Sequence, residues 1–287
     1  MKNISVGHSP DADDIFMYYA IKFGWVTLED TKFDNIALDI ETLNQATLKG
    51  EYDICAISFA LYPFVKDDFA LLKTAVSFGE GYGPKLIKKK GASLKKNFKV
   101  ALSGEFTTNA LLFKIYYPNA KVTYMNFLEI EQAVLDGVVD AGVLIHESIL
   151  TYSELLEVEK ELWDIWQELS GGDLPLPLGG MCLRRSLPLN DAIKYENMLI
   201  KAVDLANKNR KVLAPMLIEK DLIRVDASTL DKYLDLYAND NSVLLSEIQY
   251  KAIDKLFELG YKNGFYQNLI KSQDFLIPSE YEELRNR

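Results

Sequence analysis

The chain has 287 residues, of which 48% are apolar and 26% are charged, and its formal net charge is −10. This balance is typical of a folded globular protein with enough apolar material for two cores, and it excludes a largely disordered chain. The negative charge argues against nucleic acid and anionic membranes as partners. It permits a small anionic ligand, because salt screens distant surface charges beyond about 10 Å.

The N-terminal segment MKNISVGHSPDADD contains one lysine and then a polar, acidic turn. It lacks the run of roughly 7–15 apolar residues that marks a secretory signal peptide. The sequence has no run of about 18 apolar residues, so we predict no membrane-spanning helix. Cys55 and Cys182 are isolated in apolar contexts. Without an export signal we expect them to be free, buried thiols in a cytoplasmic protein.

The chain begins with a predicted strand at residues 3–7, followed by a helix. Ser9 is the expected N-cap of that helix, with Pro10 at its first position and Gly24 at its end. Three carboxylates crowd the first turn: Asp11, Asp13 and Asp14. They resemble an aspartate metal site, but we interpret them as an acidic helix start, which the helix dipole favours. No histidine or third pair of acids supports a metal.

Helices and strands alternate through the middle of the chain. We predict helices at 41–49, from about Thr107 onward, at 128–136 and at 155–170, and strands at 53–59, 85–88, 98–102 and 141–145. The glycine-rich loop 77–84 lacks the Lys-Ser/Thr of a phosphate loop, so we interpret it as a flexible crossing between lobes. From about Asp191 the chain is predicted to be helical, with 246–260 as the clearest case, ended by Gly260. This order predicts an α/β protein with parallel sheets.

An internal repeat indicates two similarly built lobes. Residues 45–53 read QATLKGEYD and residues 132–140 read QAVLDGVVD, with five identities in nine positions, and both precede an apolar strand. The pattern is typical of a helix that ends on glycine, a tight turn held by the aspartate, and a buried strand. The alternative is that such units converge on the same residues. We favour two lobes, which implies a cleft between them.

The ends of the predicted strands identify candidate site residues. In open α/β sheets, ligands bind beyond the carboxyl ends of the strands, where helix N-termini present free N–H groups. This rule selects His8 and Ser9, Ser58, the segment Thr107, Thr108 and Asn109, and the segment His146, Glu147 and Ser148. Thr107 and Thr108 fit two readings equally well, as simple helix caps or as part of an anion site.

His146 is one of two histidines in the chain. Histidine titrates near neutral pH and is the commonest general base, although a hydrogen-bonded structural histidine is the ordinary alternative. Its position at the end of a buried strand favours the base. A nucleophilic pair with Ser148 is not expected because the two residues are too close along the chain, and no zinc site is predicted. We interpret Trp163 and Trp166 as core residues rather than as a stacking platform for a ligand.

These motifs, in this order, resemble the 1,4-dihydroxy-6-naphthoate synthase family of the futalosine route to menaquinone. The matching stretches are SPDADDIF, ETLN, GYGP, the Thr107-Thr108 pair, GVLIHES and LPLPLGG, which run from the start to about residue 185. The chain has Asp11-Ala12-Asp13 where many relatives have Cys-Pro-Asn. No role is therefore carried over to these three positions.

The resemblance implies an α/β, two-lobed type II periplasmic-binding-protein-like fold with the active site in the interlobe cleft. We expect residues 1–84 plus 190–287 to form lobe I and residues 85–189 to form lobe II. The implied lyase reaction converts cyclic dehypoxanthinyl futalosine to 1,4-dihydroxy-6-naphthoate and dihydroxyacetone, without a metal or organic cofactor. His146 matches the proton acceptor of the family. The positions that match its substrate-binding residues are Ala56, Ile57, Ser58, Thr108 and Asn109.

Two alternatives share this fold. One is a solute-binding or sensor protein for a small carboxylate, and the other is the sibling enzyme chorismate dehydratase. The histidine of IHES favours the naphthoate synthase, because it matches that family's catalytic residue. The expected partner in every case is a small anionic molecule, and the sequence makes no prediction of an oligomeric state.

Overall fold

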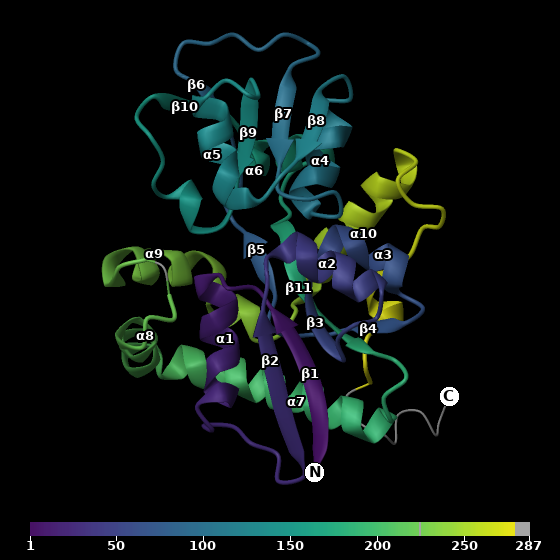
Figure 1. Ribbon diagram of the computed structural model, residues 1–287. Coiled ribbons are helices and arrows are strands. Elements are labelled where there is room, and N and C mark those ends of the chain that lie inside the picture. The colour runs from purple at the N-terminus through teal and green to yellow at the C-terminus, as the bar shows by residue number, and fades with distance from the viewer. Residues whose placement is uncertain (224, 279–287) are drawn as a thin grey trace.

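The computed structural model describes residues 1–223 and 225–278 and contains two α/β lobes, one above the other in Figure 1. Lobe I is built on a sheet with the order β2-β1-β3-β11-β4, and β5 also pairs with β11. Its strands are β1 (Lys2–His8), β2 (Thr31–Ala37), β3 (Ile54–Ser58), β4 (Phe69–Leu71), β5 (Ser77–Gly79) and β11 (Leu176–Arg184). Lobe II is built on a sheet with the order β10-β6-β9-β7-β8. Its strands are β6 (Lys85–Lys89), β7 (Lys99–Leu102), β8 (Lys121–Tyr124), β9 (Ala141–Leu144) and β10 (Leu156–Glu161).

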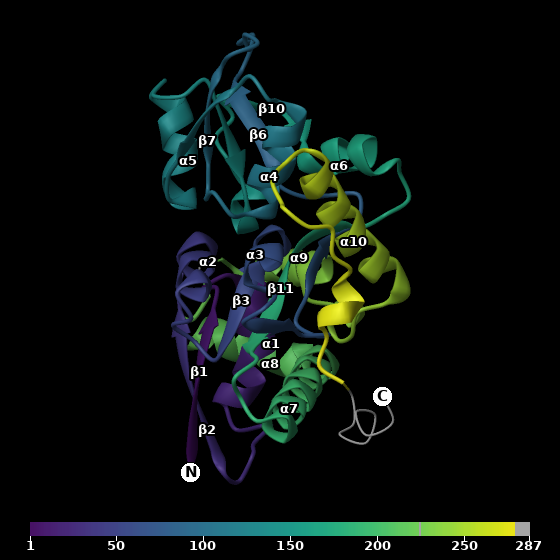
Figure 2. The same ribbon diagram turned by 90° about the vertical axis from the view of Figure 1, so that its right-hand side faces the viewer.

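Helices cover both sheets, and the C-terminal third of the chain adds most of them to lobe I (Figures 1 and 2). The helices of lobe I are α1 (Ala12–Lys22), α2 (Ile40–Leu48), α3 (Tyr62–Val65), α7 (Leu189–Lys208), α8 (Arg210–Glu219), α9 (Ala227–Tyr237) and α10 (Glu247–Lys262). Those of lobe II are α4 (Thr108–Tyr116), α5 (Phe127–Leu135) and α6 (Leu162–Ser170). Short 3₁₀ turns include η1 (Phe59–Leu61), directly after β3, and η2 (His146–Ile149), which follows β9. Helix α10 packs on β11 and also reaches α6, so it spans the junction of the lobes.

The two lobes share one core topology. In lobe I the parallel neighbours of β1 are β2 and β3, and in lobe II the parallel neighbours of β7 are β8 and β9. The sequence repeat occupies the same place in each lobe, where α2 leads to β3 and α5 leads to β9. Gly50 and Gly137, in the two connecting turns, have φ values of 66° and 74°, a conformation that glycine adopts without strain. The prediction of two similarly built lobes is confirmed.

The two repeated aspartates contact a neighbouring strand. Asp53 Oδ2 accepts a hydrogen bond from the backbone N–H of Ser5 on β1 at 2.9 Å. Asp140 Oδ2 accepts one from the backbone N–H of Lys99 on β7 at 2.7 Å. The expectation that each aspartate holds its own turn is therefore wrong. Each carboxylate instead ties a repeat to the central strand beside it, which aligns the opposite ends of those strands at the junction of the lobes.

The apolar runs of the sequence form the strands that carry the site. Every residue of β3 and of β9 is buried. Such continuous burial is typical of strands in a parallel sheet that is covered on both faces. Because both runs are fixed inside a core, Ser58, the last residue of β3, and His146, two residues after β9, have defined positions at the strand ends.

The helix predicted at 155–170 is wrong in its first part. The segment LEVEKE forms β10, which pairs antiparallel with β6, and only α6 is helical. Its alternating pattern buries Leu156 on one side of the strand, while Lys88 of β6 forms ion pairs with Glu157 and Glu159 at 3.5 and 2.6 Å. These cross-strand contacts outweigh the helical propensity of Glu and Lys. Trp166 in α6 is fully buried, as expected of a core residue.

Three boundaries also differ from expectation. Helix α1 begins at Ala12 with Asp11 at its N-cap, two residues later than the prediction of Ser9 as N-cap and Pro10 as first helical residue. Helix α10 continues past Gly260 to Lys262, because this glycine packs against the ring of Tyr266, where a Cβ would lie 2.1 Å from a ring atom. Strand β11 lies within residues 85–189, expected in lobe II, yet it pairs with β3, β4 and β5 of lobe I. Residues 224 and 279–287 of the expected lobe I lie outside the described residues.

Cys55 and Cys182 are free and buried, as predicted. They are direct partners in the pairing of β3 with β11. Burial raises the pKa of the Cys55 thiol to about 12, so it stays protonated and behaves as a small apolar side chain. Of the helices in the described part of the chain, none has both the length and the apolar character needed to cross a membrane.

Candidate active site

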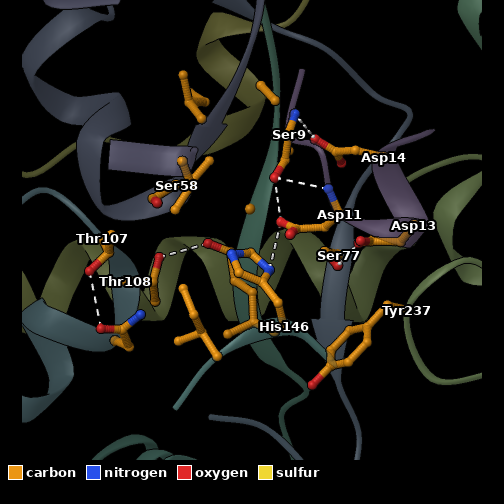
Figure 3. A pocket seen from close by; sticks show the side chains of 18 of the residues that line it. Ser9, Asp11, Asp13, Asp14, Ser58, Ser77, Thr107, Thr108, His146 and Tyr237 are labelled. Carbon is orange, nitrogen blue, oxygen red and sulfur yellow. Dashed lines mark hydrogen bonds and ion pairs between the residues drawn. The ribbon is translucent and has the colours of Figure 1, made fainter. Parts of the chain in front are cut away.

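A pocket lies between the two lobes, beyond the carboxyl ends of β3 and β9 (Figure 3). Residues from both lobes line it, and it is partly open to solvent. All six site residues predicted from the sequence line it: Ala56, Ile57, Ser58, Thr108, Asn109 and His146. Of the other strand-end residues, Ser9 and Thr107 also line it, whereas His8 lies behind the wall, stacked on Tyr18.

Ser58 is held at the end of β3 by Asn44 of α2. The backbone N–H of Ser58 donates to Asn44 Oδ1 at 3.0 Å, and Asn44 Nδ2 donates to Ser58 Oγ at 3.1 Å. Both residues are buried. Because Oγ accepts in this contact, its hydroxyl hydrogen remains free to turn toward a ligand. Asn44 belongs to the ETLN stretch, but sequence reasoning assigned it no role in the site.

The N-terminus of α4 forms the lobe II wall next to Ser58. Thr107 is its N-cap, and its Oγ1 accepts from the backbone N–H of Ala110 at 3.3 Å. Thr108 makes hydrogen bonds outside its own helix. Its Oγ1 accepts from Ala60 N–H at 3.2 Å and donates to the Leu178 carbonyl at 2.8 Å. Both partners belong to lobe I. The Thr108 hydroxyl therefore ties the lobes together in this structure instead of pointing at a ligand.

Asn109 is the second residue of α4 and lies at the same wall of the pocket. Its side-chain Nδ2 donates to Ser103 Oγ at 3.4 Å, and its Oδ1 accepts from Thr107 Oγ1 at 3.1 Å. These contacts fix the amide beside the first turn of the helix. The first backbone N–H groups of a helix have no acceptor within the helix, so this wall is suited to an anionic group.

His146 lies where β9 ends and η2 begins. Its φ of 55° is in the left-handed region, which is uncommon for a residue other than glycine and is found at functional sites. Ser148 stabilises this turn, since its Oγ donates to the Ile145 carbonyl at 2.5 Å. The His146 ring packs edge-on against Phe127 of α5, with ring centroids 4.9 Å apart. The backbone and its packing thus direct the imidazole across the pocket toward lobe I.

The imidazole of His146 meets the carboxylate of Asp11 from lobe I. Nδ1 lies 2.7 Å from Asp11 Oδ2, and the same oxygen accepts a hydrogen bond from Ser9 Oγ (Figure 3). The other ring nitrogen, Nε2, is buried and has no hydrogen-bond partner among the described residues. An acceptor on Nδ1–H leaves the Nε2 lone pair available in the neutral ring. The pair therefore has the arrangement of a histidine base oriented by a carboxylate.

The remaining carboxylates of the SPDADD turn also surround the pocket. Asp13 Oδ2 accepts from Ser77 Oγ at 3.1 Å, and Asp14 Oδ2 accepts from the backbone N–H of Ser9 at 2.7 Å. All three aspartates line the pocket, so their interpretation as only an acidic helix start is incomplete. Within residues 1–223 and 225–278, no group of three or more His, Cys, Asp or Glu side chains has an arrangement that could hold a metal ion.

The pKa values at this site are shifted by burial and by close carboxylates. Burial lowers the pKa of His146, but the charge and hydrogen bond of Asp11, with the charges of Glu147 and Asp13, outweigh it and raise the pKa to about 9. Burial raises the pKa of Asp14 to about 7. Burial, followed by the charges of Asp14 and Asp11, raises the pKa of Asp13 well above its usual value. In this state the imidazole is mostly protonated at neutral pH.

The C-terminal third of the chain completes the pocket. Tyr233 and Tyr237 of α9 line it, as do Gly179 and Gly180 of β11. A Cβ at Gly179 would lie 2.9 Å from the Ile57 carbonyl oxygen, so glycine is needed where β11 pairs with the end of β3. Sequence reasoning missed the two tyrosines, because their helix carries an ordinary amphipathic pattern without any motif.

Comparison with known proteins gives consistent results at the level of the whole chain. Residues 4–262 match the model of a family described as menaquinone biosynthesis. Two curated proteins named 1,4-dihydroxy-6-naphtoate synthase are each 30% identical to the chain. The protein of Streptomyces coelicolor aligns over 91% of this chain and 94% of its own length. The protein of Thermus thermophilus aligns over 90% and 93%, respectively.

Solved structures define the fold. A crystal structure of a protein from Archaeoglobus fulgidus is 34% identical, with a TM-score of 0.85 over 91% of this chain and 98% of that chain. The periplasmic aliphatic sulphonate binding protein of Escherichia coli is 12% identical, with a TM-score of 0.62 over 96% and 92% of the two chains. At that identity the likeness concerns the fold alone. It confirms the predicted two-lobed, periplasmic-binding-protein-like architecture.

Proposed function

Since the chain belongs to the menaquinone biosynthesis family, we propose that it is a cytoplasmic carbon–carbon lyase that converts cyclic dehypoxanthinyl futalosine to 1,4-dihydroxy-6-naphthoate and dihydroxyacetone. Support comes from two relatives that align over nearly their full length and are named for the naphthoate product. One observation carries the chemical part of the proposal. The Nε2 atom of His146 is buried at the pocket and has no partner among the described residues, so it is available to take a proton from a ligand.

The proposed reaction begins with the neutral form of His146. Nε2 removes a proton from the bound substrate, and the electron pair left behind forms a new π bond as the carbon–carbon bond breaks. The electrons of the broken bond stay on the departing three-carbon fragment as an enolate, which then takes up a proton to give dihydroxyacetone. A positioned general base of this kind contributes roughly 10²–10⁴-fold to the rate. These steps move protons and electron pairs without a net oxidation or reduction, so the proposal requires no cofactor.

The part of the pocket formed by the start of α4 and by Ser58 would bind the anionic end of the substrate. The first turn of α4 presents backbone N–H groups and the Asn109 amide, and Ser58 faces it from lobe I with its hydroxyl. The partial positive charge of a helix N-terminus stabilises a carboxylate there. Ala56 and Ile57 line the adjoining floor at the end of β3. Thr108 would act indirectly, by holding the lobes around the ligand through Ala60 and Leu178.

The proposal is tested by His146→Asn in an assay that follows naphthoate formation from cyclic dehypoxanthinyl futalosine. We expect loss of turnover by a factor of about 10³ or more, with binding of 1,4-dihydroxy-6-naphthoate in calorimetry close to that of the wild type. A matched control is His8→Asn, the other histidine of the chain, which lies outside the pocket and should retain turnover per folded molecule. Near-normal turnover of His146→Asn would overturn the assignment of the base.

The same assay separates the alternatives. Wild-type protein incubated with chorismate should give no dehydration product, because we assign the pocket to the cyclic substrate. Product formation from chorismate would instead identify the sibling dehydratase. Binding of either compound without any turnover would identify a solute-binding or sensor protein.

A further inference from the structure

The two halves of the Asp11–His146 pair come from different lobes. Asp11 precedes α1 in lobe I, whereas His146 follows β9 in lobe II, and 2.7 Å separates Oδ2 from Nδ1. The Asp11 side chain is 1% exposed and that of His146 is 18% exposed. A contact of this length cannot persist when the lobes move apart by even a few ångströms, because hydrogen bonds are lost beyond about 3.5 Å.

The capping of α1 supports a role for Asp11 in the pair. Asp11 occupies the N-cap position, where an aspartate ordinarily accepts a hydrogen bond from its own helix, but its side chain makes no capping hydrogen bond. The backbone N–H of Ala12 instead donates to Glu147 Oε1 at 3.1 Å, and Glu147 is the lobe II residue next to His146. Lobe II thus supplies an acceptor to α1, while Asp11 faces the imidazole.

A third contact joins the lobes at another point of the cleft. The backbone N–H of Phe106 in lobe II donates to Glu41 Oε2 of α2 at 3.2 Å. With Thr108, these contacts bridge the pocket from several sides, so the structure is a closed state of the two lobes. The closed state is also the one in which Nε2 of His146 is buried.

We propose that Asp11 is a positioning residue for His146, and that closure of the lobes assembles the base by bringing the Asp11 carboxylate to Nδ1. This inference rests on the proposed role of His146 as the base. In the closed state the carboxylate keeps the proton on Nδ1 and directs the Nε2 lone pair into the pocket. In an open state the imidazole lacks this partner and has no fixed orientation. Closure of the lobes therefore both pairs His146 with its carboxylate and encloses the substrate.

Several titratable groups face the imidazole. Asp11, Asp13 and Asp14 lie on lobe I, Glu147 lies on the same turn as His146, and Tyr233 of α9 lines the same pocket. Asp11 has the largest effect that raises the pKa, ahead of Glu147 and Asp13. Loss of its charge should therefore move the titration of His146 to lower pH, in the direction of the ordinary value near 6.5.

The test is Asp11→Asn, measured as kcat/KM from pH 6 to 10. A wild-type imidazole with a pKa of about 9 is roughly 1% neutral at pH 7, whereas one near 6.5 is mostly neutral. Removing the orienting carboxylate of a histidine base costs about 10⁴-fold in a well-studied case. We therefore expect a deficit of about 10⁴-fold at pH 10 that narrows to about 10²-fold at pH 7. The control is Asp226→Asn, which changes an N-cap aspartate outside the pocket. We expect its kcat/KM to equal that of the wild type at both pH 7 and pH 10.

A second readout does not depend on turnover. The chain has two histidines, so proton NMR of the imidazole Cε1–H atoms gives two titrations, and His146→Asn identifies the one that belongs to His146. We expect the His146 titration to move to lower pH in Asp11→Asn and to stay unchanged in Asp226→Asn. A deficit of equal size at every pH, or a His146 titration that does not move, would overturn the inference. Because NMR needs no substrate, it tests the pairing even if the proposed reaction is wrong.

Discussion

Replacing Gly104 with alanine should hold the two lobes apart. Gly104 lies in the loop after β7, and a Cβ on it would lie 2.3 Å from Glu41 Oε2 and 2.5 Å from Glu41 Cβ. The carboxylate can rotate away, but the Glu41 Cβ is fixed to the backbone of α2. The φ of Gly104 is not in the positive region, so alanine itself fits the loop. The substitution should therefore increase the distance between the lobes, and it should not strain the loop that contains residue 104.

The size of the effect follows from this geometry. Ordinary contacts begin at 3.4 Å, so the two Cβ atoms must separate by about 1 Å beyond their present spacing. A misplacement of about 1 Å at a reacting pair costs on the order of 10²-fold in rate, or roughly 2.7 kcal/mol of barrier. We expect kcat/KM to fall by about that factor, and the His146 titration to move to lower pH as its distance from Asp11 grows.

Steady-state kinetics and the NMR titration together measure this prediction. The matched rescue is Glu41→Gly combined with Gly104→Ala, because the glycine removes the Cβ that the alanine meets. We expect the double variant to approach the rate of Glu41→Gly alone. Wild-type kinetics for Gly104→Ala would refute the claim that close approach of the lobes at this point is needed for activity. A double variant as slow as Gly104→Ala would refute the steric explanation.

Three further substitutions test other parts of the molecule. Asn44→Ala removes both hydrogen bonds to Ser58. Because Ser58 is assigned to substrate binding, we expect KM to rise about 10-fold with little change in kcat. A fall in kcat at unchanged KM would contradict this assignment. Trp166→Ala removes a fully buried ring and should lower the free energy of unfolding by about 3–5 kcal/mol in urea denaturation. Trp163→Ala, at a partly buried position, should cost less than half as much, and equal losses would contradict the placement of the two rings in the core.

Local patterns in the sequence predicted the positions of Ser58 and His146. Each lies at the end of an apolar strand that begins after a helix and a glycine turn, and these features depend on residues close together along the chain. The end of a buried strand in an α/β lobe is also where ligands bind. Of the residues that this rule selected, Ser9, Ser58, Thr107, Thr108, Asn109 and His146 line one pocket, whereas His8 does not. Ala56 and Ile57, which line the same pocket, were expected only from the family resemblance.

Contacts between the lobes could not be predicted from local sequence patterns. Asp11 was assigned no role, because its meeting with His146 depends on how two separately folded sheets come together. The acidic turn also has a sufficient local explanation at a helix start. Tyr233 and Tyr237 lack a motif, and their placement follows from the way α9 packs on lobe I. The segment LEVEKE was predicted as part of a helix because its charged residues have high helix propensity. These residues also alternate with apolar ones, and only pairing with β6 decides between a helix and a strand.

The place of β11 in the lobe I sheet has a consequence for how the chain acquires its structure during synthesis. This strand lies between β3 and β4, but the ribosome makes it only after the whole of lobe II. Lobe II is a continuous segment and can fold as soon as it emerges, whereas the first 84 residues must wait for their central strand. Until then β3 and β4 expose unpaired edges, which favour aggregation. Lobe I, although it begins the chain, is therefore the last part to be completed.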